Sequence, residues 1–289
     1  MKRPVQSSLF HLVLLAMATT PAFAQEKTAP TEPTVEQIVA AANRVGYYQG
    51  RDGRAQVKMV IVDGQGRERV REMTILRRDQ PAAAAGETAG GAKVEADDSY
   101  CGEQRFYVRF KRPADVDKTT FLVWKRPGED DSRWLYLPAL DLVKPISAAD
   151  KRSSFVGSNF YYEDVSGRHI AADTHELIET TKDYYVIRSV PKDAKSAEFA
   201  AYKMWIHRAS SVVVKVEYRD DKDEVYRTYE ALAVDQVQGY PTVTKAKMTD
   251  LRSKGHTIVT YTDVAYDLDL PEEIFTERYL RQAPRRYMR

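Results

Sequence analysis

The chain has 289 residues, of which 43% are hydrophobic and 30% charged, and its formal net charge is +2. This near balance argues against nucleic acid as a partner, because proteins that bind it carry a clear basic excess. Cys101 is the single cysteine, so no disulfide can form within the chain. No partner motif surrounds it, and we interpret it as a tolerated loop residue.

The chain opens with the features of an export signal. Lys2 and Arg3 precede an apolar run over residues 9–18, and Pro21-Ala-Phe-Ala24 supplies a small-x-small cleavage site. The run is shorter than the roughly 20 residues that a membrane-spanning helix needs. We therefore predict a signal peptide over residues 1–24, cleavage after Ala24 and no stable membrane insertion. Loss of these two cations leaves 42 basic and 42 acidic residues.

One amphipathic helix follows a polar leader, residues 25–33, that we expect to be flexible. Thr34-Val-Glu-Gln37 has the form of a capping box, with Thr34 as the N-cap. Apolar residues recur at helical spacing from Val35 to Val45, which predicts a helix over residues 34–45 that ends near Gly46. Its apolar stripe needs the face of a sheet to cover it.

From Ala55 the hydrophobic period changes to two. Strands are expected at 55–62, 67–77, 103–111 and 119–124, and Asp63-Gly-Gln-Gly66 is typical of a turn. An Ala/Gly-rich stretch without periodicity interrupts this series. We predict a disordered loop insertion at about 79–102 inside a single domain, residues 34–289, because the strand pattern resumes immediately after it.

The most distinctive stretch lies in the middle of the chain. It contains Trp134-Leu-Tyr-Leu-Pro-Ala139 and then Ser154-Phe-Val-Gly-Ser-Asn-Phe-Tyr-Tyr-Glu-Asp164. On a strand, Trp134 and Tyr136 share one face while Leu135 and Leu137 share the other. Both faces are apolar, so this strand requires cover on both sides.

These two motifs resemble the signature of the outer-membrane lipoprotein-sorting family, and in particular its branch associated with export pumps of the resistance-nodulation-division (RND) type. The resemblance implies a mainly β, LolA-like fold: a curved antiparallel half-barrel that encloses an N-terminal helix and a short C-terminal helix. It also implies a monomer in the periplasm that binds lipid or lipoprotein acyl chains, with an inner-membrane RND-type transporter as a possible partner. Members of the branch often have two adjacent basic residues after Leu-Pro-Ala, whereas this sequence has Lys144 alone.

The C-terminal half continues the strand pattern and ends in a helical signal. Strands are expected near 175–180, 184–190, 200–207, 212–219, 224–231, 240–248 and 257–263. About ten strands joined mostly by tight turns indicate an antiparallel meander. Residues 269–275 suggest a short closing helix with Pro271 in its first turn, and the basic tail 281–289 is expected to be loose.

The motifs that carry common catalytic chemistry are absent from the sequence. His169, Asp173 and His175 would share a face of an extended segment, but charged, exposed positions rarely bind metal specifically. Glu163 and Asp164 are adjacent, so on a strand they would point to opposite faces and could not flank one bond. We expect them to bond turn amides or Arg152. The sequence therefore predicts a protein that is not an enzyme and uses no metal or cofactor.

Two functional hypotheses remain open. In the first, the protein is a carrier whose curved sheet has more apolar surface than its helices can cover, which leaves a hydrophobic cavity for acyl chains. In the second, the protein is an adaptor subunit of a pump, without lipid cargo, and docks through a polar surface. The candidate cavity-lining residues are Trp134, Tyr136, Phe155, Phe160 and Tyr162, followed by Phe106 and Trp124; the candidate docking residues are Lys144, Glu163 and Asp164. A third fold, an outer-membrane barrel, is disfavoured because the chain does not end on a strand with a terminal aromatic.

Overall fold

The computed structural model describes Met1 and residues 32–80, 103–126, 129–147 and 152–289 of the chain. Residues 33–289 form one compact unit. The predicted signal peptide after Met1, most of the leader and residues 81–102 of the loop insertion, Cys101 included, lie outside the described residues, and those predictions stay untested. The strand before the insertion extends to Asp79, where the loop was predicted to begin. Within the described part of the chain, no helix has the length and hydrophobicity needed to cross a membrane.

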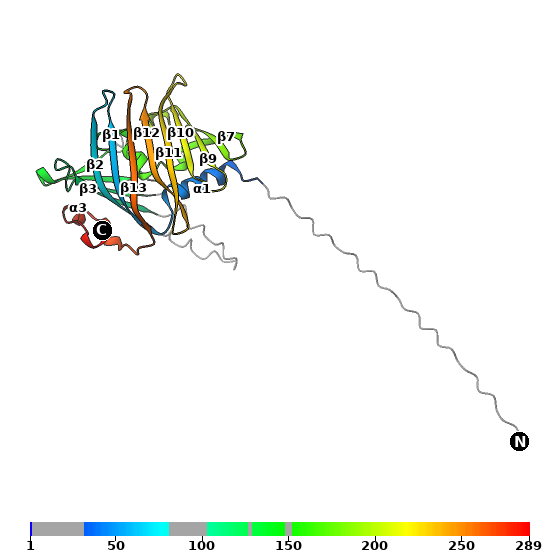
Figure 1. The fold of residues 1–289 in the computed structure, drawn as a ribbon, viewed down its shortest axis with the longest axis horizontal. Coiled ribbons are helices and arrows are strands. Elements are labelled where there is room, and N and C mark those ends of the chain that lie inside the picture. Colours follow the sequence, from blue (N-terminus) through cyan, green and yellow to red (C-terminus); the bar gives the residue numbers. More distant parts are fainter. Residues whose placement is uncertain (2–31, 81–102, 127–128, 148–151) are drawn as a thin grey trace. The chain divides into compact units, whose positions relative to one another are not determined.

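A single antiparallel sheet dominates the unit (Figure 1). Its thirteen strands follow the order β6-β5-β4-β3-β2-β1-β13-β12-β11-β10-β9-β8-β7. Strands that are consecutive in sequence are neighbours in the sheet, except β6 and β7, which form its two edges, and β1 pairs with β13. The strands are β1 (Asp52–Val62), β2 (Glu68–Asp79), β3 (Gln104–Arg112), β4 (Thr120–Lys125), β5 (Ser132–Leu137), β6 (Leu142–Ile146), β7 (Asp173–Thr180), β8 (Tyr184–Pro191), β9 (Ala201–His207), β10 (Val213–Arg219), β11 (Val225–Val237), β12 (Tyr240–Asp250) and β13 (Gly255–Tyr266). The predicted meander is confirmed, with more strands than the ten expected.

Helix α1 (Val35–Tyr47) covers one face of this sheet, which we call the inner face. The predicted capping box is present: Gln37 N donates to the Thr34 hydroxyl, and Thr34 N donates to Gln37 Oε1. The buried side of the helix packs against residues of β8 and β9 (Figure 1). This cluster contains Ile38, Val39, Ala42, Tyr185, Ile187 and Ile206. The apolar stripe predicted from the sequence thus has the expected sheet cover.

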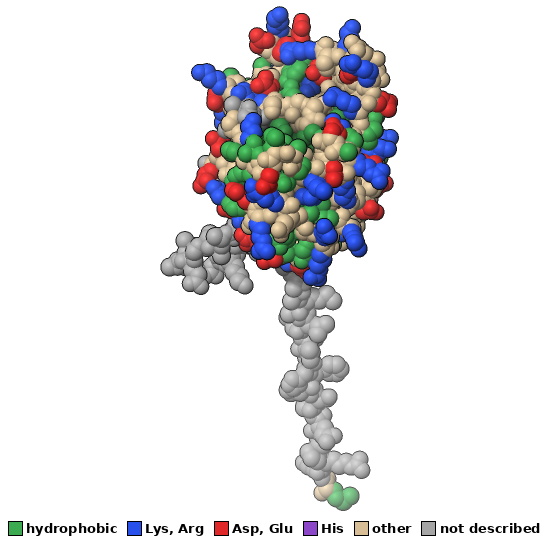
Figure 2. All heavy atoms as spheres, turned by 90° about the vertical axis from the view of Figure 1, so that its left-hand side faces the viewer, with side chains coloured by type: hydrophobic (Ala, Val, Ile, Leu, Met, Phe, Trp, Pro, Cys, Tyr) green, Lys and Arg blue, Asp and Glu red, His purple; other side chains and the backbone are tan. Residues whose placement is uncertain are grey.

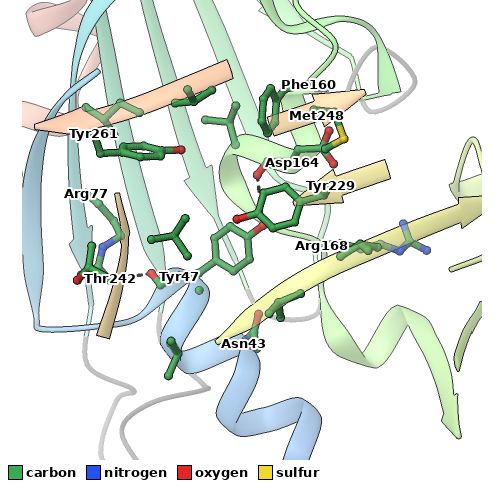
Figure 3. Close-up of a pocket in the computed structure, with 18 of the residues that line it drawn as sticks. Asn43, Tyr47, Arg77, Phe160, Asp164, Arg168, Tyr229, Thr242, Met248 and Tyr261 are labelled. Atoms are coloured by element: carbon green, nitrogen blue, oxygen red, sulfur yellow. Dashed lines mark hydrogen bonds between the residues drawn. The ribbon is translucent and has the colours of Figure 1, made fainter. Parts of the chain in front are cut away.

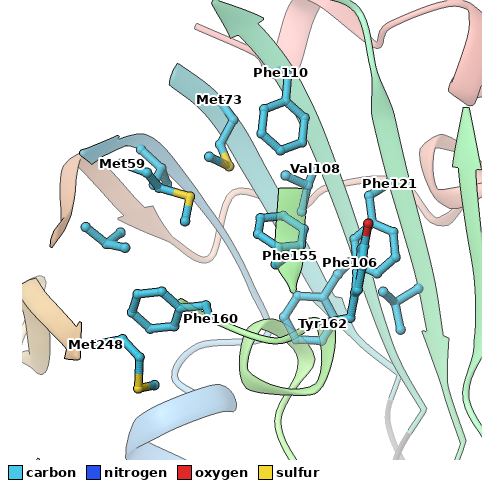
Figure 4. Close-up of a cluster of buried hydrophobic side chains, with 13 residues drawn as sticks. Met59, Met73, Phe106, Val108, Phe110, Phe121, Phe155, Phe160, Tyr162 and Met248 are labelled. Atoms are coloured by element: carbon cyan, nitrogen blue, oxygen red, sulfur yellow. The ribbon is translucent and has the colours of Figure 1, made fainter. Parts of the chain in front are cut away.

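The segment between β6 and β7 folds differently from the prediction. Glu163 and Asp164, considered above as adjacent residues on a strand, lie instead in helix α2 (Tyr162–Ser166), which follows the short 3₁₀ turn Phe155–Gly157. Phe155 and Tyr162 pack edge to face at 5.3 Å, and both contact Phe121 on the inner face (Figure 4). A local hydrogen bond from Tyr161 N to Asp164 Oδ2 favours the helical turn over an extended strand.

The C-terminal segment covers the opposite, outer face of β2–β5 (Figure 1). It contains the 3₁₀ turn Glu272–Phe275, then α3 (Glu277–Arg281) and the turn Arg285–Tyr287. The predicted closing helix over 269–275 is thus a shorter 3₁₀ turn, and Pro271 precedes it rather than lying in its first turn. The cluster consists of Leu270, Ile274, Phe275, Leu280 and Met288 packed on Leu76, Tyr107, Leu122 and Tyr136. Gln56 Nε2 donates to the Met288 carbonyl. The expectation of a loose tail was therefore wrong, because Met288 is buried against the sheet.

Candidate functional site

A cavity of about 410 Å³ lies between the inner face of the sheet, helix α1 and the segment 155–170 (Figure 3). Its volume falls within the range of about 300–1,000 Å³ typical of small-molecule sites. Strands β1, β2, β3 and β9–β13 contribute to its wall. The apolar part of this wall includes Val57, Met59, Met73, Val216, Met248 and Val259. Such a lining favours hydrocarbon over water.

Three of the predicted cavity residues line this space: Phe106, Phe155 and Phe160. Tyr162 belongs to the same core cluster as these three residues but does not line the cavity. Its ring centroid lies 4.9 Å from that of Phe121 (Figure 4). The 155–162 segment thus supplies both the wall of the cavity and the packing that supports this wall. Ligand binding by these residues stays a prediction.

The other three candidates, Trp124, Trp134 and Tyr136, lie on the outer face, away from the cavity. The two tryptophan rings are 5.2 Å apart, and Trp124 Nε1 donates to the Phe275 carbonyl at 2.6 Å. Strand alternation places Trp134 and Tyr136 on one face, as expected. The prediction that these residues line the cavity was wrong, because they lie on the outer face, where the C-terminal segment, distant in sequence, covers their rings.

The docking candidates lie on different elements. Lys144 is exposed on the edge strand β6, whereas the side chains of Glu163 and Asp164 are about 14–15% exposed on α2 and line the cavity. Glu163 pairs with Arg168, and Asp164 pairs with Arg227. Asp164 also accepts from the turn amide of Tyr161, one of the two kinds of partner expected. The Arg152 side chain, the other expected partner, bonds the Lys195 carbonyl and Glu198.

A buried lysine anchors the end of α2, and sequence reasoning missed it. Lys125 Nζ donates to the carbonyls of Ser166 and Gly167, both at 2.8 Å. Burial lowers the pKa of Lys125 to about 8, against the opposing attraction of the Asp131 and Glu163 carboxylates. A lysine at the end of a strand gives no sequence signal for this role, which depends on a segment about 40 residues further along the chain.

Tyr47, at the end of α1, joins the helix to both neighbouring layers (Figure 3). Its hydroxyl donates to the Asp164 carbonyl at 3.2 Å, while its own carbonyl accepts from Arg77 at 2.9 Å and from Gln104 at 2.6 Å. Burial raises the pKa of Tyr47, so its hydroxyl is protonated at neutral pH. These bonds fix helix α1 relative to α2 and β2 across the cavity.

The histidines and the aspartate considered for a metal site bond other groups. His175 lies 2.8 Å from the Ser189 hydroxyl and 2.9 Å from the Ile170 carbonyl, and Asp173 pairs with Arg168. His169 lies 3.3 Å from Asp131. Among the residues that the structure describes, no group of three or more potential ligands is arranged to hold a metal ion.

On the face drawn in Figure 2, Lys and Arg side chains alternate with Asp and Glu, and hydrophobic side chains gather between them. Exposed large hydrophobic side chains include Leu140, 70% exposed, and Leu142, 45% exposed, which is the first residue of the edge strand β6.

Comparison with known families and structures agrees with this architecture. A family model described as "Uncharacterized protein" matches residues 102–282. The chain belongs to this family. No curated protein matches the chain. The solved structures described next confirm the LolA-like fold class and the resemblance to outer-membrane lipoprotein-sorting proteins, both predicted from the sequence, while the association with RND pumps stays a prediction.

Three solved structures resemble the chain over nearly their whole length. A DUF1329 family protein from Desulfovibrio piger is 23% identical, with a TM-score of 0.71 over 84% of this chain and 97% of its own. A putative outer membrane lipoprotein-sorting protein domain from Vibrio parahaemolyticus is 25% identical, with a TM-score of 0.70 over 85% and 98%. A LolA superfamily protein from Nitrosomonas europaea is 18% identical, with a TM-score of 0.62 over 86% and 99%.

Proposed function

We propose that the protein is a periplasmic carrier that holds lipid or lipoprotein acyl chains in its inner cavity and shuttles them towards the outer membrane. The observation that carries this proposal is the apolar cavity of about 410 Å³ under α1 and the 155–170 segment. The similarity to a putative lipoprotein-sorting domain supports the same reading. An inner-membrane export pump of the RND type is the partner we propose for loading.

The physical requirement for such a carrier is shielding rather than catalysis. Each methylene moved from water into an apolar site gains about 0.8 kcal/mol. Ten methylenes therefore gain about 8 kcal/mol before the costs of binding are subtracted. Without those costs the dissociation constant would be about 1 μM, and the costs make the binding weaker than this. A cavity that encloses part of one acyl chain can therefore bind the cargo in water and still release it to a membrane.

The arrangement of charges also favours binding over catalysis. The two adjacent carboxylates that line the cavity, Glu163 and Asp164, are each paired with an arginine. Both carboxylates are thus engaged in ion pairs within the protein. In this proposal these groups hold α2 in place.

Lipid analysis of the purified protein tests the proposal. The full chain is exported, purified under mild conditions without detergent and extracted with organic solvent for mass spectrometry. We expect acyl lipid in near-stoichiometric amount, or its uptake from added lipid vesicles. Repeated absence of bound lipid together with no uptake would contradict the carrier function. Co-purification of an inner-membrane protein by such a lipid-free protein would instead favour an adaptor subunit.

A further inference from the structure

The wall of the cavity contains polar groups in addition to its apolar ones. Six tyrosines line it: Tyr47, Tyr202, Tyr218, Tyr229, Tyr261 and Tyr266. The hydroxyls of Tyr47, Tyr202 and Tyr266 bond Asp164, Asp173 and Thr242 respectively. The ring of Tyr218 stacks on the Arg227 guanidinium at 4.1 Å. Most of these tyrosines are thus explained by contacts within the protein.

Tyr229 and Tyr261 differ from the others. Within the described part of the chain, neither hydroxyl has a hydrogen-bond partner. Tyr229 lies on β11 opposite Met248 of β12, and Tyr261 lies on β13 opposite Val57 of β1. Both side chains pack against the apolar core cluster and enter the cavity (Figure 3).

Both hydroxyls are available as donors at neutral pH. Burial raises the pKa of Tyr261 to about 12 and raises that of Tyr229 as well, with a contribution from the neighbouring Tyr261. Both tyrosines are only partly buried, and neither hydroxyl is among the buried side-chain atoms that lack a partner, so solvent can reach both. A purely apolar ligand that fills the cavity would remove this solvent and leave both hydroxyls without a partner, which costs free energy. Two such tyrosines on one cavity wall therefore favour a ligand that supplies a hydrogen-bond acceptor.

We propose that Tyr229 and Tyr261 donate hydrogen bonds to a carbonyl oxygen of the cargo, so that the cavity selects an acyl ester or amide over plain hydrocarbon. This inference rests on the proposed carrier function and names the chemical class of its ligand. The apolar wall supplies most of the affinity, and the two hydroxyls set where along the chain the carbonyl lies. Ester and amide share this carbonyl chemistry, and the test below separates them.

The test compares three probes of equal chain length: methyl dodecanoate, N-methyldodecanamide and tetradecane. Each competes with a fluorescent apolar dye for the wild type and for the double variant Tyr229→Phe/Tyr261→Phe. We expect the variant to bind the carbonyl probe about tenfold more weakly, as loss of neutral hydrogen bonds predicts. Its affinity for tetradecane should be equal or higher, because no hydroxyl is then desolvated by the hydrocarbon. A loss with the ester alone assigns a lipid ester, and a loss with the amide alone assigns an N-acyl group.

Tyr107→Phe is the matched control, because it removes the same atom from a buried tyrosine on the outer face. The Tyr107 hydroxyl donates to the Tyr279 carbonyl at 2.8 Å. This control should lower the unfolding temperature and leave the affinity for all three probes unchanged. The double variant, which loses no such bond, should unfold at an equal or higher temperature than the wild type.

The outcomes separate the two proposals. If the double variant binds all three probes as the wild type does, the carbonyl site is wrong and the carrier function stands. If the wild type binds none of the probes, both proposals fail. Equal wild-type affinity for tetradecane and the carbonyl probes would also overturn the carbonyl site.

Discussion

Arg227 of β11 and Asp164 of α2, 63 positions apart in sequence, form a bidentate ion pair with N–O distances of 3.0 and 3.1 Å. The arginine side chain is buried and lies between the rings of Tyr161 and Tyr218, at 4.0 and 4.1 Å. This pair attaches the short helix α2 to the strands that form the opposite part of the cavity wall. It therefore joins the covering segment to the sheet.

Breaking this pair should destabilise the protein strongly. Arg227→Met leaves the Asp164 carboxylate without its main cation in a largely buried position, so we expect the free energy of unfolding to fall by about 3–5 kcal/mol. Arg252→Met is the control, because Arg252 also stacks on a tyrosine and pairs with an aspartate, but its side chain is 58% exposed. Its loss should cost less than about 1 kcal/mol. Urea unfolding measures both, and equal effects would contradict this account.

The buried Lys125 should make stability depend on pH. Its pKa is about 8 in the folded protein and near 10.4 in the unfolded chain, so between these values the unfolded state binds more protons. Stability contributed by this group therefore rises with pH in that window, by at most about 1.4 kcal/mol per pH unit. Below pH 8 the charged lysine contributes a constant cost.

Comparison with Lys125→Met isolates this effect. The difference in unfolding free energy between the wild type and the variant should change between pH 8 and 10 in favour of the wild type. Buried tyrosines such as Tyr47, whose pKa is raised, act in the opposite direction only above about pH 10. Parallel pH profiles for the two proteins would show that Lys125 does not titrate in this window.

A substitution on the outer face of the sheet should lower the stability of the protein without changing its affinity for a ligand on the inner face. Phe275 is fully buried on the outer face, so Phe275→Ala should lower the free energy of unfolding by about 3–5 kcal/mol. Because the cavity lies on the inner face, the affinity for an acyl probe should not change at temperatures where the variant is folded. A large loss of affinity in the folded variant would mean that the faces are coupled.

Local patterns were enough to predict much of the fold. Capping chemistry located the start of α1 at Thr34, and the period-two pattern located most strands because each has one apolar and one polar face. Strand β6 was missed, since Lys144 and Pro145 do not resemble a strand interior. As the last strand of the sheet it has one unpaired edge, where a proline is tolerated.

The site was predictable only in part. Periodicity showed that Trp134 and Tyr136 share a face, but the choice between inner and outer face depends on where residues 268–288 pack. Asp164 was considered as a strand residue, although its side chain accepts a local hydrogen bond from Tyr161 N that favours a helical turn. Its ion pair with Arg227 joins residues that no local pattern connects. The two tyrosines without partners gave no signal either, because the sequence does not show which hydroxyls remain unbonded.

The central claim is that the inner cavity holds the acyl chain, and the most direct test fills this cavity with a larger side chain. Val259 lines it, whereas Thr260, the next residue on β13, points to the other face. Val259→Phe and Thr260→Phe place the same ring on opposite sides of one strand. The measurement is the uptake of radiolabelled acyl lipid from vesicles by the folded proteins. If the cavity holds the acyl chain, Val259→Phe lowers uptake at least tenfold and Thr260→Phe does not; undiminished uptake by a folded Val259→Phe would contradict the account.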